Sequence, residues 1–243
     1  MVQSDEHIIE VRDLVKKFGH FVANDHISFS VEKGEIFGFL GANGAGKTTA
    51  MRILCGLLPP TSGHIHVDGF NVYNEREKIK KRIGYMSQRF SLYEDLTVRE
   101  NIRFYGGIYG LPYHEIKERT NELIDQLGLR EIQNTLIRNI PLGWRQKLAF
   151  SVAIIHHPGI VFLDEPTSGV DPITRRQFWD LIYEASSKGI TNFVTTHYMD
   201  EAEYCDRVCI LESGQIKAIG APIELKEQHN VKTINDLFLQ LVR

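Results

Sequence analysis

The stretch Gly41-Ala42-Asn43-Gly44-Ala45-Gly46-Lys47-Thr48 decides the fold of this chain. An apolar run from Ile36 to Leu40, typical of a buried strand, precedes it, and a helical pattern from Thr48 to Leu58 follows it. Strand, glycine-rich turn and helix in this order form a phosphate-binding loop, in which backbone N–H groups and the positive end of the helix point at phosphate oxygens. We therefore predict an α/β protein that binds a nucleotide at this loop.

Three side chains at the end of the loop complete the predicted nucleotide site. Lys47 can reach the β- and γ-phosphates, Thr48 offers a hydroxyl to Mg²⁺, and Thr49 follows at the start of the helix. The alternative is a glycine-rich turn with an incidental lysine, and the flanking strand and helix argue against it. We expect ATP or GTP together with Mg²⁺.

A second motif, Ile160-Val161-Phe162-Leu163-Asp164-Glu165, has an apolar run that ends in two carboxylates. Buried strands of a parallel sheet end at the ligand side of that sheet. Asp164 would hold Mg²⁺ there, and Glu165 could polarise a water molecule for attack on the γ-phosphate. Taken alone, such a pair of carboxylates is structural about as often as it is catalytic. Its occurrence together with the phosphate-binding loop favours the catalytic interpretation.

Composition excludes several other classes. The chain has 243 residues, with 28 Lys and Arg against 31 Asp and Glu, and its net charge of −3 argues against a dedicated nucleic-acid binder. No apolar stretch approaches the roughly 20 residues that cross a bilayer. The acidic N-terminus MVQSDEHIIEV does not resemble an export signal, so we expect a cytoplasmic protein. Three cysteines are too few for a disulfide framework.

The pattern along the chain predicts a core with an inserted helical part. Alternating β-rich runs come first, helical spacing dominates between about Leu96 and Asn139, and strands return from Ile160 onward. We predict one domain, divided into an α/β core at 1–95 and 156–220, a helical subdomain at about 96–155 and a helical tail at 221–243.

The combined motifs resemble the nucleotide-binding subunit of ATP-binding-cassette (ABC) transporters. Gln88 in YMSQRFSLYEDL resembles the Q-loop glutamine, Ser168-Gly169-Val170-Asp171 the D-loop, and His197 in TTHYMDEAE the switch histidine. The resemblance runs from about Ile9 to Gly220. It implies a P-loop NTPase (RecA-like) core with an N-terminal antiparallel β subdomain and an inserted α-helical subdomain.

The resemblance also implies roles for single residues. Gln88 would ligate Mg²⁺ or orient the attacking water, and His197 would donate a hydrogen bond to the γ-phosphate and hold the water against Glu165. Phe18 matches the aromatic position whose ring stacks on adenine, with Phe21 as a competing candidate. Asp171 would act across the interface of two subunits.

One motif departs from the family pattern. Where the family has Leu-Ser-Gly-Gly-Gln at the start of a helix aimed at the partner's γ-phosphate, this chain has Ile140-Pro141-Leu142-Gly143-Trp144. Pro141 offers neither a hydroxyl nor a backbone N–H, although proline suits the first turn of a helix. In one interpretation, the backbone N–H groups and the helix dipole contact the γ-phosphate in place of the serine. Similar signature motifs in exporter-type members of the family favour this interpretation. In the other, the motif is degenerate and the nucleotide site relies on a partner subunit.

We therefore predict an ATPase subunit of an exporter of the ABC-2 type, on the cytoplasmic face of the membrane. It would dimerise, with itself or with a homologue, around two Mg·ATP and drive a separate membrane permease, with no nucleic-acid partner. The rivals are a soluble ABC-type ATPase acting on ribosomes or DNA, and a nucleotide-binding partner with little hydrolysis of its own. The transported substrate does not follow from this sequence.

Overall fold

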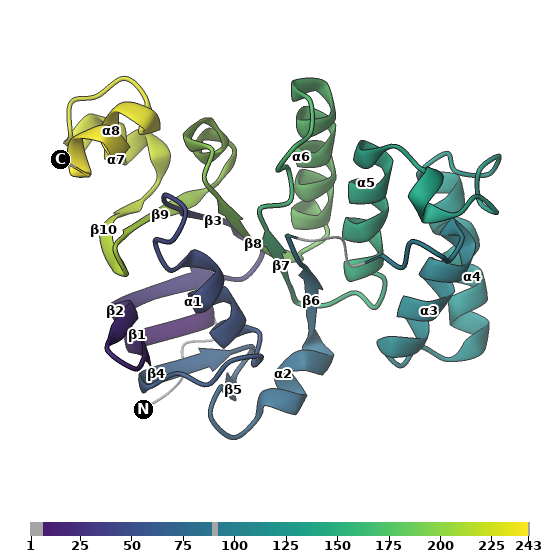
Figure 1. The fold of residues 1–243 in the computed structure, drawn as a ribbon, viewed down its shortest axis with the longest axis horizontal. Helices are drawn as coiled ribbons and strands as arrows, with labels where there is room; N and C mark the ends of the chain where they lie inside the picture. Colours follow the sequence, from purple (N-terminus) through teal and green to yellow (C-terminus); the bar gives the residue numbers. More distant parts are fainter. Residues whose placement is uncertain (1–6, 89–91, 243) are drawn as a thin grey trace.

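The computed structural model describes residues 7–88 and 92–242. The first six residues, part of the stretch on which the expected absence of an export signal depends, lie outside the described residues, as do 89–91 and 243. Two sheets organise the described part, and helices lie around the larger of them (Figure 1).

The larger sheet has six strands in the order β10-β9-β3-β8-β7-β6. Four neighbours, β3, β8, β7 and β6, run parallel to one another, so their carboxyl ends meet at one edge of the sheet. Strand β9 is also parallel to β3, whereas β10 is antiparallel to β9. The bounds are β3 Ile36–Leu40, β6 Ile83–Met86, β7 Ile160–Asp164, β8 Thr191–Thr196, β9 Arg207–Glu212 and β10 Gln215–Gly220.

Period-two alternation along the central strands divides the interior into two clusters. Phe37 and Phe39 of β3 point into the cluster shared with the smaller sheet, whereas Leu40 belongs to the cluster on the opposite face. Phe162 and Phe193 from β7 and β8 join the first cluster, with ring centroids 5.4 Å apart. Because both faces are covered, every residue of β3, β7 and β8 is buried, including the polar ones.

The smaller sheet is antiparallel, in the order β2-β1-β4-β5, with β1 at His7–Phe18, β2 at Phe21–Glu32, β4 at Ser62–Val67 and β5 at Phe70–Asn71. Strands β1 and β2 form a long hairpin that extends well beyond the short apolar runs visible in the sequence. Helix α1 (Lys47–Leu54) packs against strands of both sheets (Figure 1). The phosphate-binding stretch therefore lies where the two sheets meet.

Helix α1 ends at Leu54, four residues earlier than the sequence pattern predicts. Gly56 takes a φ of +68°, and the N–H of Leu57 donates to the carbonyl of Arg52 while that of Gly56 donates to Ile53. This pair of bonds is the Schellman arrangement, which closes a helix at a left-handed residue. The helix therefore stops at this glycine, and Leu57, which follows it, is exposed.

The other α-helices of the described residues are α2 Arg76–Arg82, α3 Val98–Ile108, α4 Tyr113–Gln126, α5 Leu142–Ala153, α6 Pro172–Ser187, α7 Pro222–Gln228 and α8 Ile234–Leu241. Helices α3 and α4 lie at the end of the molecule opposite α7 and α8 (Figure 1). The division into core, helical subdomain and tail stays a prediction. Within the described ranges, no helix combines the length and apolar character that a bilayer crossing requires.

Candidate functional site

The phosphate-binding loop connects the end of β3 to the start of α1 and packs closely on its neighbours. Gly46 has a φ of +104°, and a Cβ there would lie 2.3 Å from the carbonyl oxygen of Ala23 in β2. A Cβ at Gly41 would meet the carbonyl oxygen of Leu211 in β9 at the same distance. Only glycine fits at both positions, so strands of both sheets hold the loop in its curled form.

Asn24 of β2 holds the loop from the side of the small sheet, a role that the sequence motifs do not indicate. Its side chain is fully buried, and Nδ2 donates a hydrogen bond of 3.2 Å to the carbonyl oxygen of Gly46. Buried amide groups are seldom retained without a partner, because an unsatisfied one costs about 1–3 kcal/mol. Asn24 therefore positions the backbone on which the helix starts.

Lys47 lies buried at the mouth of the loop. Its Nζ donates to the carbonyl oxygens of Gly41 and Ala42 at 2.8 and 3.1 Å and lies 3.7 Å from Oε1 of Glu165. Burial lowers the pKa of this ammonium group, and the charge of Glu165 opposes that shift. The cation is thus held by groups that a phosphate oxygen could replace.

Asp164 ends β7 beside Thr48, the first hydroxyl of α1. Thr48 Oγ1 donates to Asp164 Oδ1 at 3.2 Å, and Thr195 Oγ1 of β8 donates to the same oxygen at 2.7 Å. Burial raises the pKa of the Asp164 carboxyl, and the two hydroxyl groups oppose the rise. A hydroxyl and a carboxylate side by side are the hard oxygen ligands that Mg²⁺ accepts with phosphate and water, so these residues fit that ion.

Glu165 is the meeting point of three segments that are distant in the sequence. Its Oε2 accepts a hydrogen bond of 2.9 Å from Nε2 of Gln88 and lies 3.0 Å from Nδ1 of His197. Its Oε1 faces Lys47. The three side chains follow β6, β8 and β3, which explains the convergence, because these strands and β7 end at the same edge of the sheet.

The backbone of Glu165 is itself unusual, with a φ of +49°. A non-glycine residue in the left-handed region is uncommon, and such strain concentrates at functional sites. Its N–H donates both to the carbonyl oxygen and to the hydroxyl of Thr195 at 3.1 Å. Thr195 therefore supports the carboxylate of Asp164 and the backbone of Glu165. Two consecutive threonines just before His197 were the only sequence signal for it.

An open cleft of about 390 Å³ joins these groups to the hairpin. Its lining includes the side chains of Lys47, Thr48, Gln88 and Glu165, with further residues of the loop and of β2. The cleft is lined by Phe21, whereas Phe18, the aromatic residue that the resemblance favours, is not among the lining residues. The ring of Phe18 is instead covered by Nζ of Lys16 at 4.8 Å.

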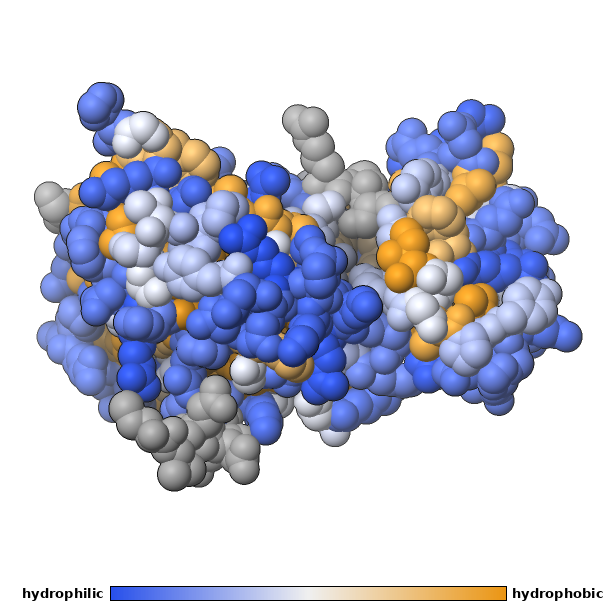
Figure 2. Space-filling model, turned by 90° about the horizontal axis from the view of Figure 1, so that it is seen from below, coloured by the Kyte–Doolittle hydropathy of each residue, from blue (hydrophilic) through white to orange (hydrophobic). Residues whose placement is uncertain are grey.

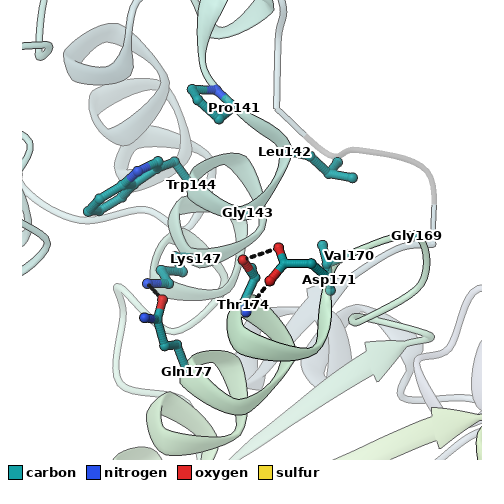
Figure 3. Close-up of a pocket in the computed structure, with 10 residues that line it drawn as sticks. All are labelled: Pro141, Leu142, Gly143, Trp144, Lys147, Gly169, Val170, Asp171, Thr174 and Gln177. Carbon is teal, nitrogen blue, oxygen red and sulfur yellow. Dashed lines mark hydrogen bonds between the residues drawn. The ribbon is translucent and has the colours of Figure 1, made fainter.

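A second cleft lies between the start of α5 and the turn before α6 (Figure 3). Pro141 precedes the first residue of α5, and Leu142, Gly143 and Trp144 form its first turn. A Cβ on Gly143 would lie 2.5 Å from Cγ2 of Thr174, so glycine lets the start of α5 approach α6. The N-terminal end of α5 thus opens directly into this cleft.

Asp171, predicted to act across a subunit interface, caps α6 in this chain. Its carboxylate accepts hydrogen bonds from the backbone N–H groups of Ile173 and Thr174 and from the Thr174 hydroxyl (Figure 3). Lys147 lines the same cleft, with its Nζ 2.7 Å from Oε1 of Gln177 and 5.0 Å from the ring of Trp144. The residues of the predicted signature and of the turn before α6 therefore form one surface.

Two comparisons of sequence identify relatives. Residues 24–168 match the profile described as ABC transporter. The chain is 47% identical over 242 residues to the probable multidrug ABC transporter ATP-binding protein YbhF of Escherichia coli, covering 98% of this chain and 42% of that protein. It is 36% identical to the linearmycin resistance ATP-binding protein LnrL of Bacillus subtilis, covering 97% of this chain and 79% of that protein.

Solved structures extend the likeness to the fold. An ATP-binding subunit of an ABC transporter superposes with a TM-score of 0.87 at 28% identity, covering 97% of this chain and all of that one. A second, cbiO1 from Clostridium perfringens, part of the ABC transporter complex cbiONQ, gives a TM-score of 0.83 at 26% identity, with 92% of each chain covered. The predicted fold class, a P-loop NTPase core with an antiparallel β part and added helices, is confirmed.

Proposed function

Because this chain belongs to the ABC transporter family, we propose that it binds and hydrolyses ATP to drive a membrane permease carried on a separate polypeptide. The observation that carries this proposal is the convergence of Gln88, His197 and Lys47 on the carboxylate of Glu165 at the edge of the cleft. Backbone strain at a residue surrounded by polar partners from several strand ends is a feature that concentrates at functional sites. The chain spans less than half of its Escherichia coli relative. The transport activity and the partners of the complete protein are therefore proposals.

The residues divide the work of binding. The backbone N–H groups of the loop and the start of α1 hold the phosphates, and Lys47 exchanges the carbonyl oxygens of Gly41 and Ala42 for phosphate oxygens. Thr48 and Asp164 would hold Mg²⁺, which when bound supplies positive charge against the phosphate oxygens. The exposed ring of Phe21 offers a flat face to the base.

Glu165 performs the chemical step in this proposal. Gln88 and His197 both bind Oε2, and they therefore fix the orientation of the carboxylate. Transfer of Lys47 to the phosphates leaves Oε1 to accept the proton of the attacking water. His197, with Nδ1 at Oε2, would hold the water between the carboxylate and the γ-phosphate. As the water oxygen bonds to the γ-phosphorus, the bond to the bridging oxygen breaks and ADP leaves with that oxygen.

The cleft at the start of α5 completes the site in a dimer. Pro141 contributes no side-chain cap, so the N–H groups of the first turn of α5 are the groups that a partner-bound γ-phosphate would meet. A second copy or a homologous subunit can supply that nucleotide. The departure from a serine at this position is then compatible with hydrolysis.

The permease would dock on the helical end of the molecule. Figure 2 shows apolar surface gathered there, and α3 exposes Phe104 and Ile108, the latter by 58%. The ring of Phe104 lies 4.7 Å from that of the exposed Tyr93, which follows the segment after Gln88. Exposed apolar patches of this kind mark interaction sites. The short segment between Gln88 in the nucleotide cleft and Tyr93 in the patch connects the two along the chain. Docking there would hold the protein at the cytoplasmic face of the membrane, and we favour an exporter of the ABC-2 type.

Replacement of the central carboxylate tests the enzymatic part. Glu165→Gln should abolish steady-state hydrolysis while nucleotide still binds, whereas Lys47→Ala should lose binding as well. Glu184→Gln, an exposed change on α6, is the matched control and should hydrolyse ATP normally. Undiminished turnover in Glu165→Gln would contradict the assignment of the base. Activity that rises with protein concentration would support the dimer.

Charge introduced on the helical end tests the docking part. Phe104→Glu combined with Ile108→Glu should release the protein from membranes of cells that contain the whole system, with ATP binding unchanged. Ile223→Glu, at the equally exposed position on α7, is the control and should stay with the membrane. If only the Ile223→Glu control is released from the membrane, the docking surface is at the end of the molecule that carries α7, and the proposed site on α3 is wrong.

A further inference from the structure

Glu201 is a fully buried carboxyl group that the proposed mechanism does not use. It lies in the 3-10 helix Met199–Tyr204, which follows His197 directly, and its relative exposure is 0%. Burial raises the pKa of this carboxyl, and a hydrogen bond from Thr167 opposes the rise. A buried acidic group is costly to keep, so its contacts indicate what it does.

The first contact of Glu201 joins it to the segment after Glu165. Its Oε1 accepts a hydrogen bond from the hydroxyl of Thr167, two residues beyond Glu165, and Thr167 is itself buried. The N–H of Ser168 donates back to the carbonyl oxygen of Glu165 at 3.1 Å. Gln146 of α5 donates to the carbonyl oxygen of Ser168 at 3.3 Å, which ties the same turn to the signature helix.

The second contact of Glu201 leads back to His197. Nε of Arg175, on α6, lies 3.5 Å from the same Oε1. The guanidinium carbon of Arg175 lies 4.2 Å from the centre of the Tyr198 ring, and the rings of Tyr198 and His197 are 4.2 Å apart. Cation and ring attract each other across such a distance. One buried oxygen thus lies on a path between Glu165 and His197 that is separate from their direct contact.

We propose that Glu201 is a positioning residue for ATP hydrolysis, which joins the turn after Glu165 to the loop that carries His197 so that the two move as one unit. The inference rests on the proposed function, because alignment of His197 with Glu165 matters only if these residues act on a bound nucleotide. Thr167 and Arg175 are the two arms of the link. A misalignment of about 1 Å at such a pair can cost a hundredfold in rate.

The hydroxyl of Thr167 is the most selective point at which to cut the link. Thr167→Val keeps the shape and removes the donor, whereas Thr167→Ser keeps the donor and removes a methyl group. We expect Thr167→Val to lower kcat about tenfold or more, with the KM for ATP within about twofold of wild type. Thr167→Ser should retain most of the rate. Glu203→Gln, at an exposed glutamate of the same 3-10 helix, is the control and should change neither constant.

Hydrogen exchange measures the link itself. In Thr167→Val the amides of 197–204 should exchange faster although the substitution lies in the other loop, and in Glu203→Gln they should not. Arg175→Gln removes the ion pair between Arg175 and Glu201 by changing the more exposed of the two partners, and it should lower kcat without changing KM. This variant tests the same link if Thr167→Val folds poorly.

The outcomes separate this inference from the proposed function. No ATP hydrolysis by the wild-type chain with its partners would remove the proposed function, whatever Glu201 does. Wild-type hydrolysis that is lost in Glu165→Gln but unchanged in Thr167→Val and Arg175→Gln would overturn the positioning role alone. So would a loss in Thr167→Ser equal to that in Thr167→Val, because the hydroxyl would then not be the cause.

Discussion

Thr195→Val removes a hydroxyl that supports the Asp164 carboxylate and the Glu165 backbone, without leaving a cavity. The hydroxyl of Thr195 donates to Asp164 at 2.7 Å and accepts from the N–H of Glu165 at 3.1 Å. That N–H keeps the backbone carbonyl of Thr195 as an acceptor, and Asp164 keeps Thr48, so neither group is left without a partner. The loss is then one hydrogen bond to a charged group, worth about 1.5–3 kcal/mol. For a chain of this length this corresponds to roughly 3–12 °C in Tm.

The pH dependence identifies Asp164 as the partner. Burial holds the pKa of Asp164 above its usual value, so ionisation of this group destabilises the folded state, and stability is lost as the pH rises through that pKa. Removing the Thr195 hydroxyl raises the pKa further and enlarges this loss. The difference in unfolding free energy between wild type and Thr195→Val should therefore be smallest below the ordinary Asp pKa of about 3.9 and grow toward neutral pH.

Urea unfolding followed by the fluorescence of the buried Trp179 measures these free energies at each pH. Thr195→Ser is the control, because it keeps the hydroxyl and should lose only about 1 kcal/mol for the buried methyl group, at every pH. A Thr195→Val protein as stable as wild type at neutral pH would refute the reasoning. So would a pH-independent difference, since the lost bond would then not involve an ionising carboxyl.

Three further outcomes are expected. Phe21→Ala should weaken ATP binding roughly 5- to 150-fold by equilibrium titration, from a stacking energy of about 1–3 kcal/mol, whereas Phe18→Ala should leave the affinity nearly unchanged. Gly46→Ala should abolish nucleotide binding in the same titration and lower the unfolding free energy by more than about 1–3 kcal/mol, because its φ is +104° and Cβ would meet the carbonyl oxygen of Ala23. Thr97→Ala, which removes the capping box of α3, should cost about 1 kcal/mol in thermal unfolding and leave the nucleotide affinity intact.

Local rules made several elements predictable from the sequence. The dipeptide Ser213-Gly214 forms the turn between β9 and β10, and Asp171-Pro172 starts α6 with a carboxylate cap and a proline in the first turn. These features depend on residues that are adjacent in the chain. The choice between Phe18 and Phe21 did not follow in the same way, because it depends on how the hairpin lies against the loop.

Asn24 and Thr195 were missed for a related reason. Each is a polar residue within a strand, a pattern that usually reports an exposed position or an irregularity. Both are fully buried here, and each donates to a group that lies on a different element. Only the packing of β2 against the loop and of β8 against β7 shows why a polar side chain is retained there.

The sequence by itself determined the chemistry of the phosphate-binding loop, because a strand, a glycine-rich turn, Lys47 and Thr48 within thirteen residues allow one local geometry. The tertiary structure alone decided that Gln88, 77 residues before Glu165, and His197, 32 residues after it, meet on one carboxylate oxygen. The physical reason is the strand order β3-β8-β7-β6, which brings four carboxyl ends to one edge. Strand order depends on contacts between distant segments, and no local pattern encodes those contacts.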